Sequence, residues 1–171
     1  MTDKKQDIVV NTSPWIALST CGQIELLKKL YADVYVPYRV KEEIMSGGKK
    51  GIGVHELKSC KWIKIEAVSD IEKVNLLSEL EQGEAEVIIL AKEKGINHVL
   101  IDEKVARLQA KVFGLEVIGT LGLLLKAKKK GLIPVIKPHI QKILEHGIWI
   151  KDEIVDGILK ESGEKSVIPK S

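Results

Sequence analysis

Five short apolar runs, rich in β-branched residues, alternate along the chain with segments of helical spacing. When each strand is joined to the next by a helix, the sheet is parallel and has helices on both faces. We therefore expect a three-layer α/β/α fold with a central, parallel, doubly wound sheet of about five strands. The predicted strands are 8–10, 34–36, 62–65, 99–101 and 116–118. The predicted helices are 14–30, 38–45, 70–80, 84–94, 103–113, 120–130, 135–146 and 152–160.

The size and composition of the chain narrow the class of protein. Its 171 residues fit one compact domain, so we expect a single domain over 1–171, with a core over about 8–133 and a C-terminal helical extension over about 134–163. The 27 basic and 24 acidic residues give a net charge of +3, which permits a nucleic-acid partner without arguing for one.

The cysteines and the apolar runs bear on the compartment. Cys21 and Cys60 lie far apart and lack metal-ligand spacing, which disfavours a zinc site or a disulfide framework. The polar start of the chain is unlike a signal peptide, and no apolar run approaches the roughly 18 residues that a membrane span needs. We therefore expect a soluble, cytoplasmic protein that makes no membrane contact.

Polar side chains follow two of the predicted strands. Asn11 comes directly after the first strand, and Asp102 comes directly after the fourth. Ligands of open parallel sheets bind outside the carboxyl ends of the strands, which makes both residues candidate ligand-binding groups. Either residue would also serve as an ordinary turn or helix cap. Glu103, beside Asp102, is an optional further acid.

A helical projection separates two adjacent acids in the segment VPYRVKEEI. Glu43 borders the apolar stripe formed by Val40 and Ile44, whereas Glu42 faces water. Glu43 is therefore a candidate site residue. The alternative is that its side chain only extends along the apolar surface or pairs with a lysine.

The segment GEAEVIILA gives a sharper contrast. Glu84 falls within the apolar face formed by Val87, Ile88 and Ala91, whereas Glu86 is expected to face water. An enclosed carboxylate needs a helix N-terminus or a cation nearby, which makes Glu84 a candidate site residue. The alternative is an ordinary acid in the first turn of a helix.

Acids that meet at one sheet edge repel one another unless a divalent cation lies among them. Mg²⁺ and Mn²⁺ take oxygen ligands and support displacement at a phosphodiester. By contrast, the sequence contains no HExxH, no GxSxG and no glycine-rich nucleotide fingerprint. The sequence therefore disfavours a zinc protease, a serine hydrolase, a kinase or a dehydrogenase.

Basic residues that could contact phosphates occur in three places. Lys49 and Lys50 lie in the glycine-rich segment 46–53, Arg107 and Lys111 share a predicted helix, and a run of lysines occupies 126–130. Contacts of this kind set affinity rather than sequence choice. The alternative for the lysine run is a solvated helix end that complements the helix dipole.

Four motifs together resemble the PIN domain, over about residues 8 to 163. They are NTSP after the first strand, VPYRVKEE, GEAEVIILA and VLIDEKVARLQAKVFGLEVIGTLGLLLKAKKKGLI. The last is most similar to a prokaryotic branch related to VapC-type toxins. The resemblance implies an endoribonuclease that depends on Mg²⁺ or Mn²⁺, cleaves single-stranded RNA and acts as the toxin of a toxin–antitoxin pair. It also implies a homodimer, with the C-terminal helices or Trp149 as contact surfaces.

The resemblance also assigns site residues. By position, the catalytic and metal-binding set falls on Asn11, Glu43, Glu84 and Asp102. Glu103, chosen above for its place beside Asp102, is an optional further metal ligand. Ser13 and Thr12 correspond to the group that positions the attacking water. Together with the basic residues named above, the expected substrate-binding residues are Thr12, Thr120, Arg107, Lys49 and Lys50.

Asn11 departs from the family pattern, because PIN nucleases usually carry aspartate at this position. The amide removes one negative charge and is expected to weaken metal binding. One alternative is therefore a catalytically weak or inactive module that binds RNA or an antitoxin-like protein. Another is a nuclease acting on DNA or structured RNA.

Overall fold

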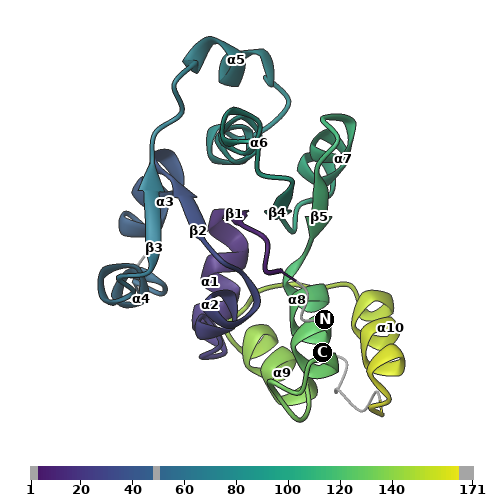
Figure 1. The fold of residues 1–171 in the computed structure, drawn as a ribbon. Helices are drawn as coiled ribbons and strands as arrows, with labels where there is room; N and C mark the ends of the chain where they lie inside the picture. Colours follow the sequence, from purple (N-terminus) through teal and green to yellow (C-terminus); the bar gives the residue numbers. More distant parts are fainter. Residues whose placement is uncertain (1–3, 48–50, 166–171) are drawn as a thin grey trace.

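The computed structural model describes residues 4–47 and 51–165. Its strands form one parallel sheet in the order β3-β2-β1-β4-β5 (Figure 1). The predicted doubly wound α/β fold is confirmed. The strands are β1 (Ile8–Val10), β2 (Val34–Pro37), β3 (Ile63–Glu66), β4 (His98–Leu100) and β5 (Glu116–Ile118).

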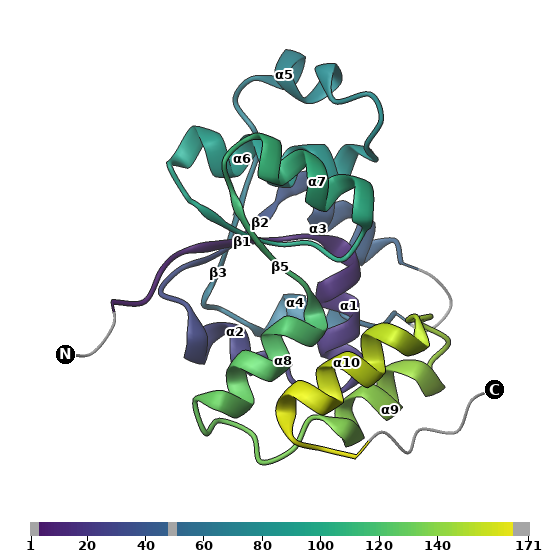
Figure 2. The ribbon, with the colours of Figure 1, turned by 90° about the vertical axis from the view of Figure 1, so that its right-hand side faces the viewer.

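Helices cover both faces of this sheet. Figure 2 shows α5, α6 and α7 on one face and α1, α2, α8, α9 and α10 on the other. The helices in the described part of the chain are α1 (Thr12–Thr20), α2 (Glu25–Leu30), α3 (Tyr38–Met45), α4 (Val54–Ser59), α5 (Ile71–Leu76), α6 (Gln82–Lys94), α7 (Lys104–Val112), α8 (Thr120–Lys129), α9 (Lys137–Glu145) and α10 (Asp152–Ser162).

The β-branched runs become strands because the sheet is enclosed between these helical layers. Ile8, Val9 and Val10 of the central strand β1 are completely buried. A strand enclosed on both faces reads as a continuous apolar run rather than an alternating one. This is why even three-residue strands were visible in the sequence.

Two helical predictions need correction. The single helix expected over 14–30 is two helices, because α1 ends at Thr20 and Gly22 adopts a left-handed φ of 70°. The short helix α4 was not predicted. It buries only Leu57, so its six residues carry no apolar period.

The connections place a topological switch between β1 and β4. From β1 the chain adds β2 and then β3 on one side, and it returns to add β4 and β5 on the other. The N–H of Asn11 donates to the Leu100 oxygen at 3.1 Å, and the N–H of Ile101 donates to the Ile118 oxygen at 3.0 Å. The residues that follow β1, β4 and β5 therefore share one edge of the sheet, where ligands of such folds bind.

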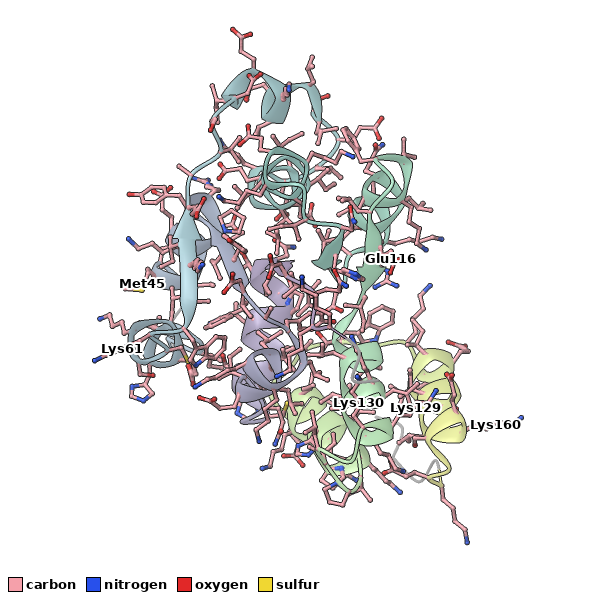
Figure 3. The ribbon with its side chains drawn as sticks, viewed as in Figure 1. Met45, Lys61, Glu116, Lys129, Lys130 and Lys160 are labelled. Atoms are coloured by element: carbon pink, nitrogen blue, oxygen red, sulfur yellow. The ribbon has the colours of Figure 1, made fainter. Side chains whose placement is uncertain are left out.

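The C-terminal helices lie at the other side of the molecule from α5 to α7 (Figure 1). Lys128 of α8 pairs with Glu164 at 2.9 Å, and Lys129 pairs with Glu161 at 3.6 Å. Figure 3 shows Lys129 and Lys130 on this C-terminal part and Lys160 pointing away from it. Two members of the lysine run thus have acidic partners within the fold. None of the helices among residues 4–47 and 51–165 has the length and apolar character needed to cross a membrane.

Candidate functional site

Asn11 and Thr12 follow β1 at the start of α1, and Thr12 contacts the acid of α3. Asn11 is only 4% exposed, and as the N-cap of α1 it makes no side-chain capping bond. The Thr12 hydroxyl donates to Glu43 Oε2 at 2.6 Å. Arg39 Nε lies 3.8 Å from the other carboxylate oxygen of Glu43, in a pair that is partly open to solvent. Glu43 is therefore held between an uncharged hydroxyl and a weak ion pair.

Glu84 lies in the first turn of α6 and is 8% exposed, as the helical projection predicted. Its Oε1 accepts the N–H of Glu81 at 3.0 Å. Burial raises the pKa of Glu84 above its ordinary value, and that N–H opposes the rise. The charges of Glu103, Glu81 and Glu43 raise the pKa further. Glu84 is thus an enclosed carboxyl group with other acids around it.

Asp102 is exposed at the end of β4, and it accepts hydrogen bonds from the first residue of α8. The backbone N–H of Thr120 donates to Asp102 Oδ1 at 2.7 Å, and the Thr120 hydroxyl donates to Oδ2 at 2.6 Å. Arg107 Nη1 donates to the Ile101 oxygen at 2.8 Å. A Cβ at Gly119 would lie 2.8 Å from Arg107 Nη1 and 2.9 Å from Asp102 Oδ1. Because Gly119 has no side chain, Asp102 and Arg107 can both lie close to the backbone there.

The other predicted site residues are distributed as follows. Glu103 caps α7 by accepting the N–H of Ala106 at 2.8 Å. Ser13 is exposed beside Thr12. Lys111 is exposed on α7. Lys49 and Lys50 lie outside the described residues.

We call the set Asn11, Glu43, Glu84, Asp102 and Glu103 the acidic edge. No ion pair of residues 4–47 and 51–165 includes Glu84 or Asp102. In this same part of the chain, however, no three His, Cys, Asp or Glu side chains are grouped so as to hold a metal ion. The charges of Glu43 and Glu103 act on Glu84. The hydrogen-bond donors to Glu43, Glu84 and Asp102 are threonine hydroxyls and backbone N–H groups.

Glu86 corrects a prediction. It was expected to face water, yet it is only 6% exposed. Its Oε1 accepts the N–H of Arg39 at 3.3 Å. Burial raises the pKa of Glu86, and the N–H and charge of Arg39 oppose the rise. The projection failed because α6 is buried on every side from Gly83 to Ala91.

Gly83 was also missed as a residue of the site. A Cβ at this position would lie 2.9 Å from the Cδ and from Oε2 of Glu43. A glycine in the first turn of a helix is itself a usable signal, because alanine is favoured there unless space is needed. Nothing in the sequence indicated which side chain takes up the space.

An acidic edge at the switch point of a doubly wound parallel sheet is typical of proteins that bind ligands through charged groups at strand ends. The family described as "PIN domain" matches residues 7–164, so this chain belongs to the PIN-domain family. PIN domains are generally nucleases and typically use divalent metal ions. Membership therefore indicates a nuclease-type function and nucleic-acid binding. None of the curated proteins compared with the chain matches it.

The residues of the acidic edge fit a divalent ion in their chemistry. Carboxylate, amide and hydroxyl oxygens are the ligands that Mg²⁺ and Mn²⁺ prefer. Burial, followed by the charges of neighbouring acids, raises the pKa of Glu84, so positive charge placed beside it would stabilise its ionised form. With the side chains as they stand, Thr12 and Thr120 occupy oxygens of Glu43 and Asp102.

Proposed function

We propose that this protein is an endoribonuclease that depends on Mg²⁺ or Mn²⁺, cleaves single-stranded RNA and acts as the toxin of a toxin–antitoxin pair, as VapC-type proteins do. The observation that carries the proposal is the surroundings of Glu84, which is enclosed among the charges of Glu103, Glu81 and Glu43. Bound positive charge would relieve that repulsion. We further propose that it acts in the cytoplasm.

Glu43, Glu84 and Asp102 would hold the ion, with Asn11 as a neutral ligand and Glu103 as a further acid. When bound, such an ion supplies positive charge that stabilises the negative charge developing on a phosphodiester. Thr12 and Thr120 orient the carboxylates of Glu43 and Asp102 through their hydroxyl groups. They thereby fix two of the three acids before substrate arrives.

The remaining residues bind substrate and water. The exposed hydroxyl of Ser13 would orient the attacking water at the carboxyl end of β1. Arg107 uses Nη1 for the Ile101 oxygen, and its guanidinium has further N–H donors for a phosphate. Lys49 and Lys50 would add phosphate contacts. Trp149 is 78% exposed, and we propose it as a contact of a homodimer.

The direct test is cleavage of end-labelled single-stranded RNA with Mn²⁺, with Mg²⁺ and with EDTA, by wild type and by Asp102→Asn. An asparagine at 102 can still accept the Thr120 N–H and donate to the Thr120 hydroxyl, so the fold should survive. The loss of one charged ligand is expected to lower cleavage by at least about 100-fold.

Glu42→Gln is the matched control, because Glu42 is exposed and adjacent to Glu43. It should cleave like wild type. Equal cleavage by Asp102→Asn and wild type would overturn the assigned site. A panel of double-stranded DNA and structured RNA decides the substrate class, since faster cleavage of either would replace single-stranded RNA.

A second function is favoured by one residue, Asn11, which stands where PIN nucleases usually carry aspartate. The chain would then be a catalytically weak or inactive module that binds RNA or an antitoxin-like protein. Arginine or lysine side chains of such a partner could pair with Glu43, Glu84 and Asp102. Calorimetry with Mn²⁺ separates the two functions, because only the nuclease requires the ion.

A further inference from the structure

Two of the contacts between helices α3 and α6 lie one helical turn apart. On α3 the contact residues are Arg39 and Glu43, at i and i+4. On α6 they are Gly83 and Glu86, at i and i+3. Residues with these spacings lie on one face of a helix, so the two contacts lie on the faces with which α3 and α6 pack against each other.

The first contact is made by a missing side chain. Gly83 has no left-handed φ, so its backbone conformation does not require glycine. An added Cβ would lie 2.9 Å from Cδ and Oε2 of Glu43, and closer still to Oε1. The carboxylate of Glu43 therefore occupies the space that any other residue at 83 would fill.

The second contact holds the beginning of α3. The N-cap of α3 is Pro37, whose side chain has no acceptor for the free N–H groups of the first turn. Glu86, from the neighbouring helix, accepts the N–H of Arg39 at 3.3 Å. Its negative charge at a helix N-terminus also suits the helix dipole. This accounts for a carboxylate that is only 6% exposed on α6.

We propose that Gly83 and Glu86 are positioning residues that seat α3 against α6, so that the Glu43 carboxylate reaches the Thr12 hydroxyl at 2.6 Å. Gly83 sets how closely the carboxylate approaches α6, and Glu86 sets where α3 begins. Their effect on ion binding rests on the proposed function, in which Glu43 is a ligand. Their effect on the position of Glu43 does not.

The first test is the crystal structure of Gly83→Ala together with its Mn²⁺ affinity measured by calorimetry. We expect the Glu43 carboxylate to leave Thr12 and the affinity to fall about tenfold, as for other groups that orient a ligand. In the Glu43→Gln background, Gly83→Ala should cause no further loss, because its effect acts through Glu43. An additional loss in that background would contradict the proposal.

Gly157→Ala is the matched control. Gly157 lies inside α10, and an added Cβ there meets nothing within 4 Å. The same substitution should leave Glu43 and the Mn²⁺ affinity unchanged, which separates the effect of position from that of a glycine replaced in a helix.

The second test uses Glu86→Gln and Glu86→Ala. Glutamine keeps an acceptor for the Arg39 N–H and should preserve the Glu43–Thr12 contact, whereas alanine should release it and lower Mn²⁺ affinity about tenfold. If Glu86 only stabilised the fold, we would not expect Glu86→Gln to keep both the Glu43–Thr12 contact and the Mn²⁺ affinity of the wild type.

The failures of the two proposals are distinguishable. If wild type binds no Mn²⁺, the proposed function fails, and the crystal structures still decide the positioning. If the Glu43 carboxylate stays on Thr12 in both Gly83→Ala and Glu86→Ala, the positioning proposal is wrong whether or not the ion binds.

Discussion

Glu84 in the acidic edge and Glu164 beyond α10 are both largely enclosed carboxylates, yet their surroundings are opposite. Burial would raise the pKa of Glu164, but the N–H of Ile136, the Lys128 ammonium, the N–H of Lys137 and the Ser162 hydroxyl lower it to about 2. Around Glu84, burial and three neighbouring acids raise the pKa against one N–H donor. Where the fold supplies enough donors, a carboxylate stabilises the structure. Where it does not, the carboxylate is available to a ligand.

The largest expected effect concerns Glu164, the carboxylate that has enough hydrogen-bond donors. At pH 7, Glu164→Gln should lose about 3 kcal/mol of unfolding free energy, because Glu164 has a folded pKa of about 2 against an ordinary value of 4.5. Because its pKa is lowered on folding, the contribution is complete above 4.5 and is lost as the pH falls through about 2. Thermal unfolding of both proteins between pH 7 and pH 2 measures this.

Glu161→Gln is the control for that substitution. Glu161 pairs with Lys129 at 3.6 Å with both side chains more than half exposed, so its loss should cost less than about 1 kcal/mol. If Glu161→Gln and Glu164→Gln were equally destabilising, the contrast between satisfied and exposed acids would be wrong.

A smaller effect is expected from adding charge to the acidic edge. Asn11→Asp should raise Mn²⁺ affinity about tenfold, because a carboxylate is a stronger ligand than an amide. It should also lower the metal-free stability, because Asn11 is 4% exposed and the substitution buries a charge there. Calorimetry and thermal unfolding report the two changes.

The same substitution at the opposite end of the sheet provides the control. Asn97 is exposed just before β4, so Asn97→Asp should change neither the affinity nor the stability by a measurable amount. No gain in affinity from Asn11→Asp would remove Asn11 from the ligand set.

The smallest expected effect concerns Glu84, the carboxylate that has too few hydrogen-bond donors. Glu84→Gln should raise the melting temperature of the metal-free protein at pH 7 by about 2 °C, because the amide carries no charge to be buried among other acids. Because the pKa of Glu84 is raised on folding, its ionised form costs stability at neutral pH and the cost fades as the pH falls towards 4.5. The gain should shrink in the same way. A destabilised Glu84→Gln at pH 7 would contradict the comparison.

The fold was predictable because the type of each residue indicates whether its side chain is buried. The five β-branched runs became the five strands of the sheet, each within a residue or two of the predicted bounds. The two helix predictions that were wrong depended on a single backbone angle and on a very short helix. Gly22, with a φ of 70°, divided one predicted helix, and α4 carried too few apolar residues to be seen.

The acidic edge was only partly predictable. The positions of Glu84 and Asp102 followed from helix faces and strand ends, which are local properties of the sequence. The partners of each acid were not, because Thr120 reaches Asp102 and Thr12 reaches Glu43 only through the tertiary fold. The burial of Glu86 was missed for the same reason, since it depends on α3 packing against α6.

Glu164 also bears on where the polypeptide can be shortened or extended. It bonds to the N–H groups of Ile136 and Lys137 and to Lys128, and it is the last residue matched by the family. A chain truncated one residue earlier would leave the entrance to α9 uncapped and Lys128 without its carboxylate, although every helix would still be encoded. Expression tags and fusions therefore belong beyond this residue, and a minimal fragment of the PIN domain has to include it.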